Sequence, residues 1–470
     1  MIAQSVEQVA VNHWVGGSSP SQGAIFFVSS YGDFMDTQTK KSKMGFWSLL
    51  SIVIGAQLGA SIFLLPSQLA QYRTLGLCGW MIGGIGAILL TIVFSFLCTN
   101  TEKSGGPHIY ARMFFGEKVG FFITWIFWCG AWACNPILIA TAVNYLMSFV
   151  GDMSQTQKII CEIAMVFSLT YINLRGVKTT GIFEMILTTF KVLPLIIIPI
   201  LAFQHINMEN FKEITPVGMS PSETIIKAAI LSFWGFVGLE GGTTPAGDVK
   251  NPKRNIPLAI VLGTTIVAVI SLVNTFAIFG IISPTELENI GAPFAQIMVR
   301  LFGGSYDKVI GLITFIMCYG SLNAWVFFSG QIAKTAAAEK IFPKFFANRN
   351  KYDAPNAALW TAFIGTVTIL FLQKSPLFED KIGKFLDMSV LIYIVLYTVA
   401  VLCYFKFMIT GKTKSIAKWV ITSLAMVFCI FMIYKSDLVD FSAVVAILLL
   451  GLPVYIKHSR NTKSNRNSLQ

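Results

Sequence analysis

The stretch SIVIGAQLGASIFLLPSQLA, residues 51–70, is apolar at both ends but carries small and polar residues in its middle. Gly55, Gln57 and Gly59 stand where a simple membrane helix would carry Leu or Val. Glycine in a helix interior costs roughly 1 kcal/mol relative to alanine, and a glutamine buried in lipid needs a hydrogen-bond partner. Two explanations are open at this point. The Gly55-x3-Gly59 spacing could serve close helix packing, or the helix could be interrupted where it lines a polar cavity.

The composition of the chain places this stretch in a lipid bilayer. Of the 470 residues, 54% are hydrophobic and only 12% are charged, whereas a soluble domain has about 25% charged residues. A spanning helix needs about 20 mostly apolar residues, and open sheets cannot exist in lipid. We therefore predict an all-α integral membrane protein with twelve transmembrane helices. These lie near residues 45–70, 78–98, 119–149, 158–173, 182–203, 224–247, 257–282, 308–333, 356–373, 386–405, 418–434 and 438–456.

The basic residues predict the orientation of these helices. With the N-terminus placed in the cytoplasm, 24 Lys and Arg residues fall in cytoplasmic segments and nine in the opposite loops. This bias follows the positive-inside rule and predicts that both termini are cytoplasmic. The net charge of +12 is thus explained by contact with the lipid bilayer, and we expect no nucleic-acid partner.

A second interrupted segment, SFWGFVGLEGGTTPAGDV at residues 232–249, lies five spans after the first. It carries Gly235, Gly238, Gly241 and Gly242 within eight residues of one another. Two glycine-interrupted spans in corresponding positions of successive halves are typical of inverted-repeat transporters. In that architecture freed N–H groups and helix N-termini bind a carboxylate, and freed carbonyls bind an ammonium. The matching second segment favours interruption over packing as the explanation of the first.

Four stretches of the chain resemble the amino acid–polyamine–organocation (APC) superfamily, and within it the bacterial arginine/agmatine and putrescine/ornithine antiporters. They are GAQLGASIFLLPSQLA (55–70), GGPHIYARMFFG (105–116), FWGFVGLEGGTTPAGDVKNPKRNIPLAI (233–260) and SLNAWVFFSGQIAKTAAAEKIFP (321–343). The first departs from the family's usual Gly-Ser/Ala-Gly, since it reads Gly59-Ala60-Ser61. The resemblance implies a leucine-transporter-type fold: two inverted five-helix repeats plus two peripheral helices, with helices 1 and 6 unwound at mid-membrane.

This architecture divides the chain into six parts. They are a cytoplasmic tail (1–44), a first repeat of helices 1–5 (45–203), an extracytoplasmic loop (204–223), a second repeat of helices 6–10 (224–405), helices 11 and 12 (406–457) and a cytoplasmic C-terminal tail (458–470). The last two helices carry no motif, so packing or the contacts of a homodimer are their expected roles.

The interruptions and the resemblance together assign the candidate substrate-binding residues. These are Ala56, Gln57, Leu58, Gly59, Ala60, Ser61, Phe233, Trp234, Phe236, Val237 and Trp325. In the resembling antiporters the tryptophan that matches Trp234 closes over the substrate, and a guanidinium or ammonium can pack on its face. Packing as a core aromatic is the alternative for Trp234, as an interhelical hydrogen bond is for Gln57.

Two ionisable residues are expected inside the membrane, where a charge is expensive and points to function by default. Glu240 could couple transport to pH or bind a proton in exchange, or it could hold the unwound segment by a hydrogen bond. In several sodium-independent family members a lysine at the position of Lys191 braces the fifth helix against the first. A buried pair with a carbonyl is the alternative for Lys191.

The resulting functional prediction is secondary active transport of an amino acid, with exchange of basic amino acids and their decarboxylated amines as first choice. A sodium-independent neutral amino-acid permease or a proton symporter is the alternative. No Walker-type phosphate loop, clustered catalytic set or repeated ion filter is present, which argues against a pump, an enzyme or a channel. We expect no metal and no cofactor, because the His and Cys residues are scattered. The expected location is the bacterial inner membrane.

Overall fold

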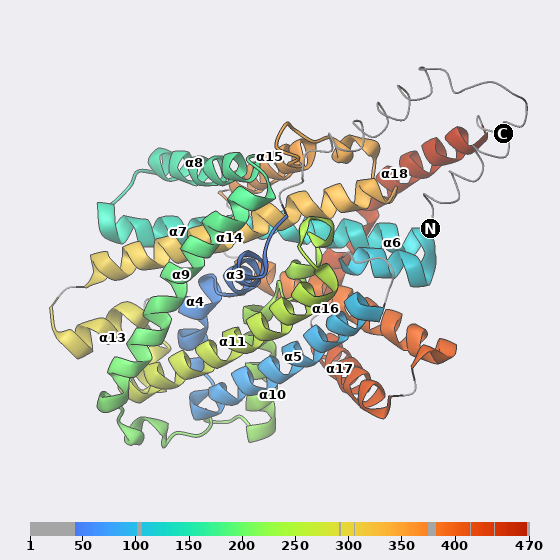
Figure 1. Ribbon diagram of the computed structural model, residues 1–470. Helices are drawn as coiled ribbons and strands as arrows, with labels where there is room; N and C mark the ends of the chain where they lie inside the picture. The colour runs from blue at the N-terminus through green and yellow to red at the C-terminus, as the bar shows by residue number, and fades with distance from the viewer. Residues whose placement is uncertain are drawn as a thin grey trace, which may run out of the picture. The chain divides into compact units, whose positions relative to one another are not determined.

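The computed structural model describes residues 43–100, 106–290, 293–304, 306–374, 382–413, 415–436 and 438–467. Nearly all of the predicted N-terminal tail therefore lies outside the described residues. The remaining chain from Lys43 onward is built of helices (Figure 1). Its one backbone bridge outside helices, within the described residues, joins Met44 to Val249.

Sixteen α-helices follow one another along the described chain. They are α3 (Phe46–Gln57), α4 (Ala60–Ala70), α5 (Gly76–Asn100), α6 (Pro107–Ala133), α7 (Asn135–Val150), α8 (Gln155–Asn173), α9 (Val177–Ala202), α10 (Pro221–Phe233), α11 (Pro252–Ile281), α12 (Pro284–Leu287), α13 (Pro293–Phe302), α14 (Asp307–Ala338), α15 (Asn356–Gln373), α16 (Ile382–Phe407), α17 (Ile416–Tyr434) and α18 (Leu438–Asn467).

Ten helical stretches of the described chain are long and apolar enough to cross a membrane. They are Phe46–Ala70, Arg73–Asn100, Pro107–Met147, Val177–His205, Pro221–Thr243, Pro252–Ile281, Lys308–Ala338, Asn356–Gln373, Met388–Gly411 and Ile416–Tyr434. The helices expected near 158–173 and 438–456 are present as α8 and α18, but neither is among the ten. The chain is therefore an integral, multi-pass membrane protein, and this criterion leaves the exact number of spans open.

Apolar side chains cover the outer helices. On α9 the side chain of Ile200 is 65% exposed, and on α17 that of Val427 is 63% exposed. Side chains of this kind lose no free energy when they face lipid, so these surfaces fit a bilayer. In contrast, α3 is buried among α9, α11 and α14, and Figure 1 shows it nearly end-on between them.

The first expected span is interrupted at Leu58 and Gly59, between α3 and α4. Leu58 has φ −79° and ψ 74°, and Gly59 has φ −114° and ψ −140°, both outside the helical region. No side chain caps the N-terminus of α4. The interruption thus leaves the C-terminal end of one helix and the N-terminal end of another at the same depth.

The sixth expected span is α-helical only in its first half, as α10. From Trp234 to Asp248 the backbone forms separate 3₁₀ turns, and α11 begins at Pro252. The backbone of the segment 224–247 is thus unwound after α10, as expected for the sixth helix. Within this irregular segment Gly238 has a φ of +102°, a conformation that residues with a Cβ rarely adopt.

The third expected span also contains an interruption, which the sequence analysis did not predict. Helix α6 ends at Ala133 and α7 begins at Asn135, directly before Pro136. Proline cannot donate a backbone hydrogen bond and clashes with the preceding turn, so it breaks the helix there. The two ends of this break place Cys134 and Asn135 in the interior of the protein.

The chain before α3 is tied to the end of the unwound sixth span. The Met44 N–H donates to the carbonyl of Asp248 at 2.8 Å, and the Lys250 N–H donates to the carbonyl of Met44 at 2.9 Å. The side chain of Asp248 in turn pairs with Lys334 of α14 at 2.5 Å. These contacts hold the two interrupted spans side by side.

Candidate functional site

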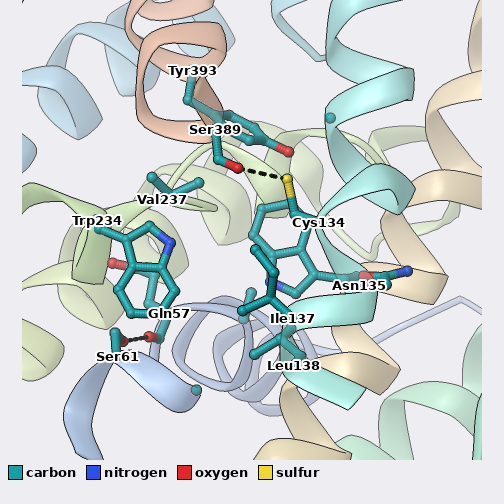
Figure 2. A pocket seen from close by; sticks show the side chains of 14 residues that line it. Gln57, Ser61, Cys134, Asn135, Ile137, Leu138, Trp234, Val237, Ser389 and Tyr393 are labelled. Atoms are coloured by element: carbon teal, nitrogen blue, oxygen red, sulfur yellow. Dashed lines mark hydrogen bonds between the residues drawn. The ribbon is translucent and has the colours of Figure 1, made fainter. Parts of the chain in front are cut away.

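A cavity lies where the interruptions meet (Figure 2). It encloses about 520 Å³ of empty space, a volume that includes the solvent at its open mouth. None of the described residues that line it is charged. They are Ala56, Gln57, Gly59, Ser61, Gly130, Cys134, Asn135, Ile137, Leu138, Trp234, Val237, Trp325, Ser389 and Tyr393.

The helix ends at the first interruption give the cavity its polarity. The first N–H groups of α4 have no intrahelical partner, and the helix dipole places partial positive charge there, so this end suits a carboxylate. The C-terminal ends of α3 and α10 carry partial negative charge and suit an ammonium. A zwitterion matches both kinds of helix end at once.

Gln57 and Ser61 bridge the first interruption. The Ser61 hydroxyl donates to the carbonyl of Gln57 at 3.2 Å, across the break. The Gln57 amide donates to Thr264 of α11 at 3.2 Å, while its Oε1 has no hydrogen-bond partner within the described chain. Gln57 therefore combines the two predicted roles, since it makes an interhelical hydrogen bond and also lines the cavity.

Aromatic side chains form much of the cavity wall. In Figure 2 Trp234 stands across the cavity from Cys134, with Ser389 and Tyr393 beside the thiol. Trp325 packs edge-on against Tyr393, with ring centroids 5.6 Å apart. The Tyr393 hydroxyl is buried and has no partner among the described residues, so it is free to bind a ligand.

Three of the predicted binding residues do not line the cavity. Phe233 and Phe236 are fully buried in an aromatic cluster, where Phe233 packs on Phe428 and Phe236 on Trp80. Phe233 ends α10 and Phe236 lies on the turn that follows, and neither side chain lines the cavity. The side chain of Leu58 is also buried in the core, while its backbone forms part of the interruption and its carbonyl lies 2.8 Å from the Ser321 hydroxyl.

The backbone of Ala60 begins α4, but its side chain lies outside the described part of the chain.

Glu240 is fully buried and is not among the residues that line the cavity. Its Oε2 accepts a hydrogen bond from the Tyr397 hydroxyl at 2.5 Å. The Gly238 N–H donates to the same hydroxyl at 3.4 Å. Tyr397 thus joins the unwound sixth span to α16.

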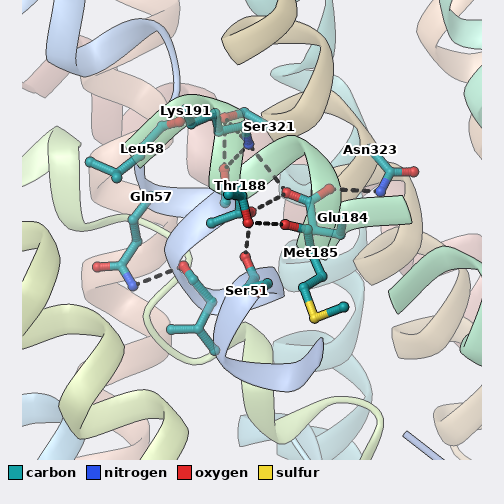
Figure 3. A network of polar contacts seen from close by, with 12 residues as sticks. Ser51, Gln57, Leu58, Glu184, Met185, Thr188, Lys191, Ser321 and Asn323 are labelled. Carbon is teal, nitrogen blue, oxygen red and sulfur yellow. Dashed lines mark hydrogen bonds and ion pairs between the residues drawn. The ribbon is translucent and has the colours of Figure 1, made fainter. Parts of the chain in front are cut away.

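Lys191 lies against the first interruption, as Figure 3 shows. Its ammonium donates to the carbonyl of Gly55 at 3.1 Å and to the Ser321 hydroxyl at 3.4 Å. It also forms an ion pair with Glu184 at 3.2 Å, and both side chains are completely buried. The lysine contacts the broken end of α3 from α9, the position that the family resemblance implies for it.

The sequence analysis missed several residues of this region. Glu184 lies seven residues before Lys191, a spacing that puts both on one helix face, and this was the available signal. The Asn135-Pro136 pair signalled the break in the third span. No sequence pattern singled out Tyr393, because its position in the cavity depends on how α16 packs.

The geometry contains no group of three or more His, Cys, Asp or Glu side chains in the described residues that could hold a metal ion. The site is instead made of backbone ends, an amide, hydroxyls, a thiol and aromatic rings. Such groups can offer hydrogen bonds and ring faces to a small organic ion.

Comparison with known proteins identifies transporters that are similar to this chain. The putrescine transporter PotE of Escherichia coli K12 is 28% identical over 363 residues, which cover 77% of this chain and 83% of PotE. PotE of Haemophilus influenzae is 27% identical over 360 residues, covering 76% and 83%. The cadaverine/lysine antiporter of E. coli K12 is 27% identical over 440 residues, covering 90% of this chain and 97% of the antiporter.

Residues 44–454 also match the amino acid permease family, which is nearly the whole of the described chain. The match includes every interrupted span and every residue that lines the cavity. The family and the relatives are transporters. The names of the relatives describe transport of small amines or amino acids. The chain therefore belongs to the amino acid permease family and is an APC permease similar to polyamine antiporters.

Proposed function

We propose that the protein is a secondary active transporter that exchanges basic amino acids and their decarboxylated amines by alternating access. The observation that carries this proposal is the cavity at the two interrupted spans, where uncapped helix ends of both signs meet aromatic walls. The names of the relatives support amine and amino-acid exchange, and Trp234 and Trp325 offer ring faces to a cationic group.

A neutral amino-acid permease is the second candidate, because no charged side chain lines the described cavity. A diamine would bring two positive charges and no carboxylate to the N-terminus of α4, whereas a neutral amino acid leaves neither helix end unmatched. Proton symport is a further variant of this candidate. As substrates, arginine and lysine are intermediate between a diamine and a neutral amino acid, because each has an α-carboxylate and one distal cation.

The proposal includes the predicted architecture. We propose twelve spans arranged as two inverted repeats (45–203 and 224–405) joined by the loop 204–223, with peripheral helices in 406–457. Both termini, 1–44 and 458–470, are placed in the cytoplasm, the membrane is the bacterial inner membrane, and a homodimer is the proposed assembly. Because Lys191 supplies a positive charge at the first interruption, transport is proposed to need no sodium.

The test is uptake of labelled arginine by proteoliposomes loaded with unlabelled arginine, agmatine, putrescine, lysine, leucine or buffer. If the protein is an exchanger, uptake of labelled arginine depends on a substrate inside the liposomes. The loaded compound that supports this uptake identifies the substrate class. Uptake driven by leucine alone favours the neutral permease. Sodium replacement by choline is expected to leave uptake unchanged, and a sodium requirement would contradict the role given to Lys191. If no loaded compound supports uptake of labelled arginine and no compound competes with it, the proposal is refuted.

A further inference from the structure

The carbonyls at the broken end of α3 depend on side chains from other helices. In an uninterrupted helix the Gly55 carbonyl would accept from the Gly59 N–H, but that N–H donates to Gln57 instead. Ser321 of α14 replaces the missing donor, with its hydroxyl 2.7 Å from the Gly55 carbonyl and 2.8 Å from that of Leu58. The Lys191 ammonium is the second donor to Gly55, at 3.1 Å.

The Lys191 ammonium is held in this place by Glu184. Both side chains are completely buried, and an ammonium without a counter-charge is unstable in such surroundings. Glu184 Oε1 accepts from Lys191 at 3.2 Å and from Thr188 at 3.2 Å, and Oε2 accepts from Asn323 of α14 at 2.7 Å. The carboxylate is therefore fixed from two helices, and the pair as a whole is neutral.

Two glycines make the space that this pair occupies. A Cβ on Gly55 would lie 1.9 Å from Glu184 Oε1, and a Cβ on Gly320 would lie 2.4 Å from Lys191 Cε. A side chain at either position would force the carboxylate or the ammonium out of its present place. The two glycines of α3 and α14 thus leave the room in which the pair sits, which is an observation independent of the hydrogen bonds.

We propose that Glu184 is a positioning residue of the substrate site. It neutralises Lys191 and aims the ammonium at the Gly55 carbonyl, so that the broken end of α3 keeps the backbone geometry that the substrate needs. Thr188 extends the same contact, because its hydroxyl also lies 3.0 Å from the Ser51 carbonyl of α3, the second acceptor available to its one proton. Figure 3 shows this network joining α3, α9 and α14. The inference rests on the proposed transport function.

The experiment compares Glu184→Gln with the double variant Glu184→Gln/Lys191→Met and with Glu162→Gln. Glu162 is the matched control: it is also a buried carboxylate paired with a lysine, Lys374 at 2.8 Å, but it does not line the cavity or contact α3. For each purified variant we would measure arginine affinity, with a lysine and leucine panel, and the apparent Tm.

Glu184→Gln is expected to weaken substrate affinity by about tenfold or more, the fold-change for losing a hydrogen bond to a charged group. It is also expected to lower the apparent Tm, since Lys191 stays buried without its counter-charge. The double variant removes both charges together, so its Tm recovers above that of Glu184→Gln while its affinity stays low. Glu162→Gln is expected to keep wild-type affinity. The proposal is overturned if the double variant recovers substrate affinity as well as Tm. It is also overturned if Glu184→Gln keeps wild-type affinity.

A ligand-free measurement separates this inference from the proposed function. Hydrogen exchange of the backbone around the first interruption, residues 51–61, is expected to be faster in Glu184→Gln than in wild type or Glu162→Gln. If wild type binds none of the compounds but this difference is found, the proposed substrate is wrong and the positioning role stands. If wild type binds substrate and the exchange rates are equal, the positioning role is wrong.

Discussion

The conformation of Gly238 offers a sharp test of the unwound sixth span. Replacing Gly238 by alanine forces a Cβ onto a residue with φ +102°, which costs about 1–2 kcal/mol in strain. The new Cβ would also lie 3.1 Å from Trp325 and 3.3 Å from Ala56, and both of these line the cavity. The substitution therefore strains the backbone directly beside the cavity.

The expected size of the effect follows from the strain. If substrate binds the conformation described here, a penalty of about 1–2 kcal/mol lowers the affinity by roughly 5- to 30-fold. The assay is titration of purified protein with arginine, followed by tryptophan fluorescence, because Trp234 and Trp325 line the cavity. The apparent Tm is measured in parallel and is expected to fall.

Gly247 provides a matched control in the same irregular segment. It is exposed, its φ is not positive, and a Cβ built on it meets no heavy atom within 4 Å. Gly247→Ala is expected to retain wild-type affinity and Tm, since the substitution adds no strain. If Gly238→Ala and Gly247→Ala behave alike, the backbone at Gly238 does not shape the site and the reasoning fails.

Three further predictions concern single side chains. Trp234→Ala is expected to weaken arginine binding more than Trp234→Phe, which keeps a ring face, and equal losses in a direct binding assay would exclude stacking. Glu240→Gln, which preserves shape but cannot titrate, is expected to flatten the pH profile of exchange in proteoliposomes; an unchanged profile would leave Glu240 a structural partner of Tyr397. Tyr393→Phe is expected to weaken binding of lysine by about 10- to 150-fold relative to norleucine, the range for one hydrogen bond to a charged group, and parallel losses for both in a competition assay would count against a side-chain contact.

The sequence was sufficient for the class of protein and for the interruptions of the first and sixth spans, but not for that of the third. Long apolar runs require helices in lipid, because only helices satisfy their own backbone there. Gly59 and Gly238 marked the two interruptions because glycine destabilises a helix locally, and local effects can be read from local sequence. Trp234 and Trp325 were placed at the cavity by motif resemblance, and both do line it.

Only the tertiary structure decided which side chains face the cavity and which side chains pair with one another. Phe233 and Trp234 are neighbours in the chain, yet one is in the core and the other lines the cavity, because the turn after α10 sends them in different directions. Lys191 was conspicuous as a single residue, but its contacts with Gly55 and Ser321 join positions more than 100 residues apart. Such pairings depend on how whole helices pack, and no local pattern of residues carries that information.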